Sequence, residues 1–219
     1  MRDAIEKICA RFGDDYWLKR DSDGEFPHEF HRALASDGWL GVCIPESYGG
    51  SGLGVSEAAV MMHTIAESGA GFSGASAVHM NIFGLNPVVV YGTDEQKRRM
   101  LPPIVTGKEK ACFAVTEPNA GLETAKLQTR AERRGDRYIV NGAKIWISKA
   151  QVADKMLILT RTTPAEQAPT ACHCSSPRST AALSKCPRSR RWGARPSTRT
   201  RCSSTTSKSR LRTASARKA

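Results

Sequence analysis

The sequence predicts an α+β fold in which a helical N-terminal part precedes a run of short antiparallel strands and a disordered basic tail. Three observations support this prediction. Hydrophobic residues recur at helical spacing up to about residue 110. From residue 111 to residue 166 they alternate, as they do in strands. Beyond residue 169 there are no acidic and few large apolar residues. Such a tail buries too little surface to offset the entropy lost on ordering.

The helical part is predicted from apolar stripes and from glycine turns between them. The first stripe has the i, i+3, i+4, i+7 spacing of one helix face and consists of Ile5, Ile8, Cys9 and Phe12. Further helices are expected over residues 26–39, 57–68 and 75–90, separated by a glycine-rich loop at 45–54. Thr93, with Gln96 three residues later, forms a capping-box signal that begins another helix.

The strands are predicted where the apolar pattern changes to a period of two. Five segments have this pattern, at residues 111–116, 127–131, 138–140, 144–148 and 153–160. Gly135-Asp136 and Asn141-Gly142 supply turn signals, and Asn-Gly is a strong hairpin signal. The alternation stops near Gln167, so the sheet is expected to be incomplete.

The net charge of +12 comes from the tail and not from the folding part. Residues 170–219 hold 13 of the 33 Lys and Arg residues and none of the 21 acidic ones. A basic tail is one way to bind nucleic acid, with an affinity that falls steeply with salt. Trp192 is its only aromatic residue, and this weakens that interpretation because single-strand binders usually stack bases on aromatic rings.

Other functional classes receive little support from the sequence. The seven cysteines have no zinc-site spacing, and Cys172-His173-Cys174 lacks a second ligand pair, so no metal is predicted. The N-terminus is charged throughout and has no apolar segment typical of a secretory signal. No apolar run approaches the ~18 residues of a membrane span, so a cytoplasmic protein is expected. No Ser/His/Asp triad, P-loop or dinucleotide fingerprint is present.

Two segments carry the candidate chemistry: Phe113-Ala-Val-Thr-Glu-Pro-Asn-Ala-Gly121 and Asn141-Gly-Ala-Lys-Ile-Trp-Ile-Ser148. If residues 144–148 form a strand, Trp146 and Ser148 point to one face. A planar ligand could then stack on the indole and accept hydrogen bonds from the hydroxyls of Thr116 and Ser148. The spacing alone favours the alternative, an aromatic side chain that fills a barrel core.

Several ordered motifs together resemble the acyl-CoA dehydrogenase family of flavoproteins. They are Tyr48-Gly49-Gly50, the run from Gly92 through Gln96-Lys97 and Leu101-Pro102 to Gly107, Thr116 to Gly121, and Lys144 to Ser148. The resemblance covers nearly all of residues 1–166. It implies a helical N-terminal domain at 1–110 and an incomplete antiparallel β-barrel middle domain at 111–166. Residues 167–219 have no counterpart in the family.

The resemblance also implies FAD as cofactor, bound between the middle domain and a C-terminal helical bundle. The FAD contacts carried over by position are Phe113, Val115, Thr116, Gly121, Leu122, Trp146 and Ser148. Many members have Ser-Asp where this chain has Leu122-Glu123, so only a backbone contact is carried to Leu122. The family removes an α proton from an acyl-CoA thioester with a glutamate of the C-terminal domain, while hydride passes to the flavin. No residue of this chain is therefore assigned as catalytic.

The family implies acyl-CoA as substrate, an electron acceptor and a homotetramer, and the 219-residue chain is expected to be an inactive product. The tail is consistent with a change of reading frame near Gln167. In the shifted frame the first base of each codon becomes a middle base. Residues 202–207 then permit Val-Phe-Phe-Asp-Asp-Leu, which is the order of the family's next barrel strand. The alternatives are a repurposed domain with a nucleic-acid-binding tail and an inert remnant.

Overall fold

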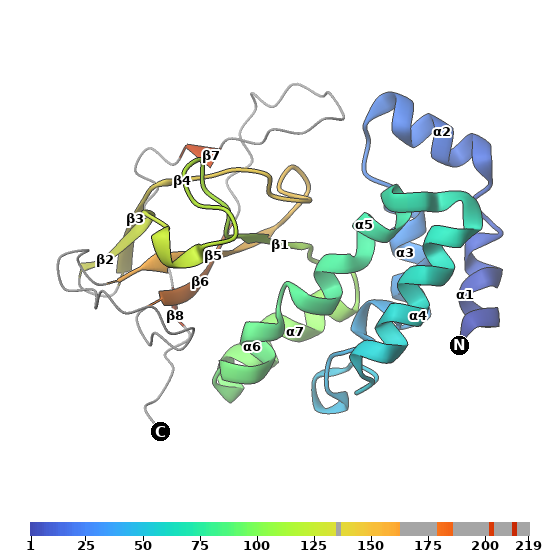
Figure 1. Cartoon of the computed structure of the whole chain (residues 1–219). Coiled ribbons are helices and arrows are strands. Elements are labelled where there is room, and N and C mark those ends of the chain that lie inside the picture. The colour runs from blue at the N-terminus through green and yellow to red at the C-terminus, as the bar shows by residue number, and fades with distance from the viewer. Residues whose placement is uncertain (135–136, 163–178, 186–201, 204–211, 214–219) are drawn as a thin grey trace. The chain divides into compact units, whose positions relative to one another are not determined.

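A computed structural model of the chain describes residues 1–134, 137–162, 179–185, 202–203 and 212–213 (Figure 1). These residues belong to two compact units. The first contains Met1–Ala111, and the second contains the described residues from Cys112 onward. Among the described residues, no helix is long and apolar enough to cross a membrane.

The first unit is helical, as the sequence predicts. Its α-helices are α1 (Arg2–Cys9), α2 (Asp14–Asp23), α3 (His28–Ser36), α4 (Val55–Ile65), α5 (Gly71–Phe83), α6 (Asn86–Tyr91) and α7 (Asp94–Val105). A π-helical segment, Ala66–Ala70, joins α4 to α5. Two 3₁₀ turns, Trp39–Gly41 and Glu46–Tyr48, lie between α3 and α4.

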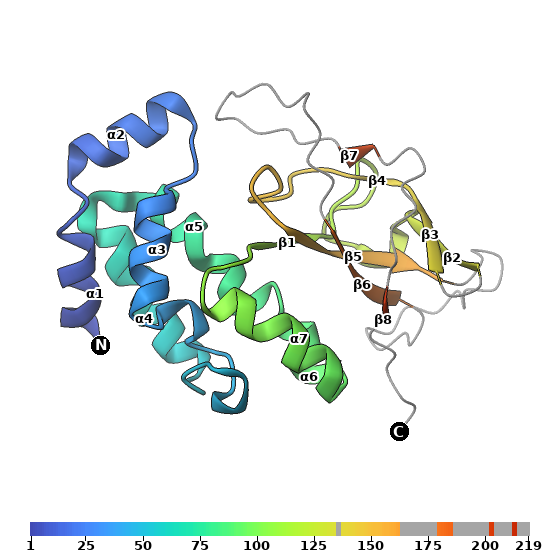
Figure 2. The ribbon, with the colours of Figure 1, turned by 180° about the vertical axis from the view of Figure 1, so that it is seen from behind.

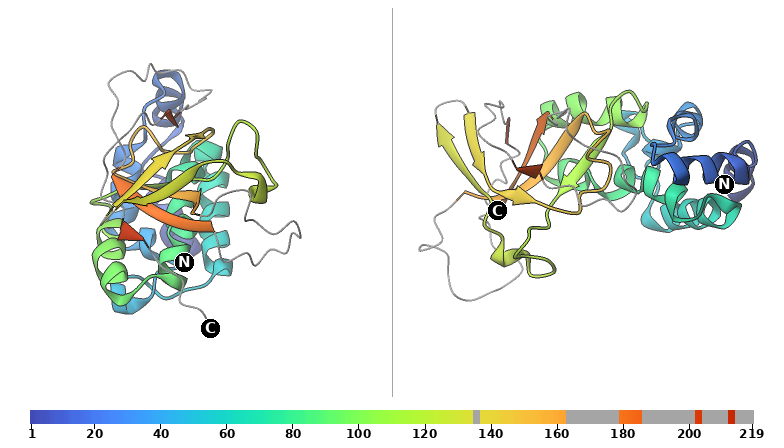
Figure 3. Two further views of the ribbon diagram at one scale, coloured as in Figure 1. Left: turned by 90° about the vertical axis from the view of Figure 1, so that its left-hand side faces the viewer. Right: turned by 90° about the horizontal axis from the view of Figure 1, so that it is seen from above.

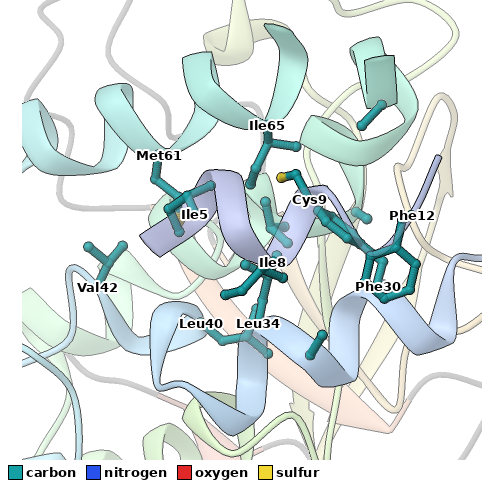
Figure 4. Close-up of a cluster of buried hydrophobic side chains, with 14 of the residues drawn as sticks. Ile5, Ile8, Cys9, Phe12, Phe30, Leu34, Leu40, Val42, Met61 and Ile65 are labelled. Carbon is teal, nitrogen blue, oxygen red and sulfur yellow. The ribbon is translucent and has the colours of Figure 1, made fainter. Parts of the chain in front are cut away.

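The core of this unit forms around the apolar stripe of α1. Ile5, Ile8, Cys9 and Phe12 are each at most 8% exposed, and they pack with buried side chains of α3 and α4 (Figure 4). Phe30 contacts the ring of Phe12 edge-on, with 5.4 Å between the ring centroids. Burying a side chain of this size contributes about 1.5–3 kcal/mol, so the predicted stripe is a main source of the unit's stability.

Two of the sequence motifs shape the local backbone of this unit, one as a tight loop and one as a helix cap. In the Tyr48-Gly-Gly loop, a Cβ on Gly50 would lie 1.9 Å from the Ile44 carbonyl oxygen, so only glycine fits there. At the start of α7, the Thr93 hydroxyl accepts the Gln96 N–H at 3.3 Å, and the Gln96 side chain accepts the Thr93 N–H at 2.8 Å. The predicted capping box is therefore confirmed.

The second unit is built on a mixed sheet. Its strands are β1 (Ala111–Ala114), β2 (Arg130–Arg134), β3 (Arg137–Asn141), β4 (Ala143–Lys144), β5 (Lys155–Arg161), β6 (Ser179–Lys185), β7 (Cys202–Ser203) and β8 (Arg212–Thr213). The six-stranded sheet has the order β3-β2-β5-β6-β8, with β1 also paired to β5, and β4 pairs separately with β7.

The register shows where the prediction of an antiparallel barrel needs correction. The β2–β3 hairpin is antiparallel from Arg130↔Asn141 to Arg134↔Arg137 (Figure 3). The contact of β2 with β5 is parallel, at Arg130↔Arg161. The sheet is therefore mixed, and its described strands end at β3 and β8 without closing into a barrel. Strand periodicity specifies which face of the sheet a residue occupies. It does not show whether the neighbouring strand runs parallel or antiparallel.

The tail also differs from the prediction of disorder, at three short stretches. β6 pairs antiparallel with β5 over seven residues, from Lys155↔Lys185 to Arg161↔Ser179 (Figure 2). β7 and β8 add two residues each. An uncovered edge of β5 offers backbone donors and acceptors to any segment that can extend. Other predictions for residues 167–219 lie outside the described residues.

Candidate functional site

All seven predicted FAD-contacting residues belong to the second unit, and two hydrogen bonds bring their two segments together. The Ile145 N–H donates to the Thr116 carbonyl at 2.9 Å. The Lys144 ammonium donates to the Val115 carbonyl at 2.8 Å. The end of β1 and the chain after β4 therefore run beside each other, as a shared ligand requires.

The Thr-Glu-Pro-Asn-Ala-Gly segment is a tight turn. The Glu117 N–H donates to the Ala120 carbonyl at 2.9 Å, and the Ala120 N–H donates back to Glu117 at 3.2 Å. Pro118 and Asn119 form the exposed tip, and the fixed φ of proline suits this position. Thr116, directly before the turn, is half-buried.

Glu117 and Lys144 form a buried ion pair beneath this turn, which the sequence prediction missed. Nζ and Oε1 are 2.8 Å apart, and each side chain is 5% exposed. The carboxylate also accepts the backbone N–H groups of Gln128, at 2.5 Å, and Thr129, at 3.0 Å. One ion pair thus joins the turn, the chain before β2, and β4. The sequence held one indication of this contact: the two motifs each contain one of two opposite charges, Glu117 and Lys144.

The environment holds this pair in its ionised form. Burial acts to raise the pKa of Glu117, but hydrogen bonds from Gln128, Lys144 and Thr129 outweigh it and lower the pKa to about 2. Burial lowers the pKa of the Lys144 ammonium, and the carboxylate beside it opposes that shift. A buried charge is tolerated when it is paired and hydrogen-bonded in this way.

Trp146 does not lie on a strand, and here the sequence prediction is wrong. β4 ends at Lys144, and Trp146 has a φ of +59° in the left-handed region. This backbone conformation breaks the period of two. It leaves the Trp146 side chain 53% exposed, and it buries Ile147, which is 5% exposed, with Cys112, Ala114 and Met156. Ile147 therefore occupies the core, which contradicts the alternative that Trp146 fills a barrel interior.

The remaining predicted residues border open space. Ser148 is exposed at the start of a turn. Leu122 is fully exposed, and a Cβ on Gly121 would meet nothing within 4 Å. Phe113, in β1, and Val115 are half-buried. An accessible indole, exposed and half-buried hydroxyls and an unobstructed glycine loop suit a large planar cofactor with a diphosphate such as FAD.

Two further observations bear on candidate sites elsewhere in the described chain. Within the described residues, no group of three or more His, Cys, Asp or Glu side chains could hold a metal ion. An open surface depression of about 480 Å³ occurs in the first unit and contains none of the predicted site residues. It is lined by Arg11, Phe12, Glu29, Arg32, Ala33 and Ser36.

Comparison with known protein families identifies the class. The N-terminal domain of acyl-CoA dehydrogenase matches residues 1–108, and its middle domain matches residues 112–201. These matches cover most of the sequence, so the chain belongs to the acyl-CoA dehydrogenase family. The resemblance found in the motifs is confirmed.

Individual relatives agree with this assignment. The acyl-CoA dehydrogenase FadE12 of Mycobacterium tuberculosis is 34% identical over 170 residues, which cover 76% of this chain and 42% of that protein. The mitochondrial isovaleryl-CoA dehydrogenase of Bos taurus is 34% identical over 164 residues, with 74% and 38% covered. A solved structure described as an FAD complex of PigA has a TM-score of 0.72 and 26% identity over 83% of this chain and 46% of that one. The chain thus spans less than half the length of these relatives.

Proposed function

We propose that this chain is the N-terminal and middle-domain part of an FAD-dependent oxidoreductase that introduces an α,β double bond into an acyl-CoA thioester. The observation that carries the proposal is the pairing of the two motif segments through the Ile145–Thr116 hydrogen bond. It brings Thr116 and the segment of Trp146 together in a chain that belongs to a dehydrogenase family. The FAD complex among the similar structures supports the choice of cofactor.

The chain's own residues would bind and orient the cofactor. The hydroxyls of Thr116 and Ser148 can donate hydrogen bonds to the polar edge of the flavin ring. The indole of Trp146 can cover one face of the ring and exclude water. Gly121 and the Leu122 backbone would lie along the diphosphate, where no side chain obstructs the approach. When bound, FAD supplies the acceptor for the hydride that leaves the β carbon.

The other half of the reaction needs a base from elsewhere. Removing the α proton of a thioester requires a positioned carboxylate, and the family resemblance places that group in a C-terminal domain. Glu117 is unsuited to the role because it is buried and ion-paired, and because its hydrogen bonds lower its pKa to about 2, which makes it a weak base. We therefore expect no acyl-CoA oxidation by the 219-residue polypeptide alone. An electron acceptor and homotetramer assembly belong to the same proposal, as does a cytoplasmic location.

We also propose that residues 167–219 are read from a shifted frame. Supporting this are the abrupt loss of acidic residues after Glu166 and the shifted-frame agreement at residues 202–207. The match of the amino-acid sequence to the middle domain extends to residue 201. This corrects the expectation that no residue after 166 has a counterpart in the family, and it favours the alternative that the chain continues in frame. Sequencing the DNA across codons 160–175 distinguishes a shifted frame from a continuous one. An intact relative with the same basic tail in frame would overturn the frameshift.

Titration of FAD into the purified 219-residue chain tests the proposed cofactor site. Binding is expected to quench tryptophan fluorescence because the flavin would stack on Trp146. A Trp146→Leu variant should lose most of this quenching. The matched control is Trp17→Phe, which changes a buried tryptophan of the helical unit and should leave the quenching intact. Quenching of equal size in both variants would contradict the site.

A further inference from the structure

The Glu117–Lys144 pair differs from the other ion pairs of the described residues in its burial. The Arg2–Glu6 pair has a similar length, 2.9 Å, but both side chains are about half exposed. Glu117 and Lys144 are each only 5% exposed. Burying two charges costs desolvation energy that their attraction often fails to repay, so such a pair is a weak way to stabilise a fold.

The contacts of the pair coincide with the proposed cofactor site. Glu117 directly follows Thr116, and Lys144 lies two residues before Trp146. Lys144 donates to the carbonyl of Val115 at 2.8 Å as well as to the carboxylate. Lys144 thus holds the backbone of Val115, a residue that we assign to the flavin. Glu117 in turn holds the Lys144 ammonium.

A pair of apolar side chains could fill the same space but could not reproduce this geometry. The ammonium gives two directional bonds, one to a carbonyl and one to a carboxylate. The carboxylate accepts two more, from the N–H groups of Gln128 and Thr129. Together they fix three chain segments relative to one another, and a site must be held to within about 0.5 Å to bind well.

We propose that Glu117 and Lys144 are positioning residues of the flavin site. They hold Val115 and Thr116 in register with the segment that carries Trp146, so that the hydroxyl and the indole meet the same ring. This inference rests on the proposed function, since it gives the pair a purpose in cofactor binding. A purely structural pair would only stabilise the second unit.

A comparison of three variants separates the two roles: Lys144→Met, Glu117→Gln, and the two substitutions combined. The double variant leaves no unpaired buried charge, so its unfolding midpoint should recover toward the wild type. If the pair positions the site, FAD affinity should not recover with it. The dissociation constant should stay raised by about 10- to 100-fold, by analogy with the loss of a group that orients a metal-binding residue. The matched control is Lys126→Met, which removes a surface partner of Glu123 at the same 2.8 Å distance.

Amide hydrogen exchange at Ile145 gives a second readout that needs no FAD. Its N–H bonds to Thr116, and it should exchange faster in the double variant than in the wild type. Wild-type FAD affinity together with wild-type Ile145 exchange in the double variant would overturn the positioning role. If the wild-type chain binds no FAD, the proposed function fails. In that case, unchanged Ile145 exchange in the double variant would also overturn the positioning role. Faster exchange would support the view that the ion pair keeps Ile145 bonded to Thr116.

Discussion

The left-handed conformation of Trp146 makes a prediction about stability that can be worked out from the backbone. An L-residue in this region costs about 1–2 kcal/mol, whereas glycine adopts it freely. Trp146 has a φ of +59° and is 53% exposed. Its conformation is therefore strained, and its side chain contributes only part of its possible burial energy.

Two substitutions isolate the strain from the loss of the indole. Trp146→Ala removes the side chain and keeps the strained backbone, and Trp146→Gly removes both. The glycine variant also loses about 0.4–1 kcal/mol of folding stability relative to the alanine variant, because glycine gives the unfolded chain more conformational freedom. The glycine variant should then be more stable than the alanine variant by about 0.5–1 kcal/mol, after this loss is subtracted from the relief of strain.

Urea unfolding measures this difference as a shift in midpoint at constant slope. The control is the same pair of substitutions at Ser148, which is exposed and lacks a positive φ. There alanine should be the more stable by about 0.5–1 kcal/mol, so the sign reverses. A Trp146→Gly protein no more stable than Trp146→Ala would refute the assignment of strain to this residue.

Four further predictions concern single contacts. Lys144→Met should destabilise the second unit by about 3–5 kcal/mol in urea unfolding, because Glu117 is left buried without its cation. The pKa of Glu117 falls from an ordinary 4.5 to about 2, so its stabilising contribution is complete above the ordinary pKa and is lost as pH falls through 2. Acid titration of Glu117→Gln should show a smaller loss over that range. Gly142→Ala would place a Cβ 2.7 Å from the Thr129 Cα and should cost about 1–3 kcal/mol. Thr93→Ala should cost about 1 kcal/mol by removing the cap of α7, and a change below 0.3 kcal/mol would contradict that role.

The helical unit was predictable because its signals are local. The stripe of Ile5, Ile8, Cys9 and Phe12 needs only the period of the helix, and the Thr93 cap needs only the next three residues. Both are observed. The family motifs located the candidate site for a similar reason, since each is a short contiguous segment.

The parts that were missed depend on tertiary context. A period of two places Trp146 and Ser148 on one face, but it cannot show that a positive φ interrupts the strand at Trp146. The Glu117–Lys144 contact joins residues 27 positions apart, so neither motif alone reveals it. The pairing of β6 with β5 likewise joins two segments that are separated in the sequence.

Two of these missed features, the ion pair and the strained Trp146, lower the stability of the second unit, and they involve neighbouring residues. A buried ion pair and a strained aromatic residue each lower stability unless surrounding structure compensates. The compensation is visible on either side of Trp146: the Ile145 N–H is bonded to Thr116, and Ile147 is buried in the core. Because both neighbours are fixed, the indole cannot relax into the core without breaking one of these contacts. An unfavourable conformation that its neighbours enforce, and that leaves the indole 53% exposed, is consistent with the proposal that a ligand stacks on Trp146.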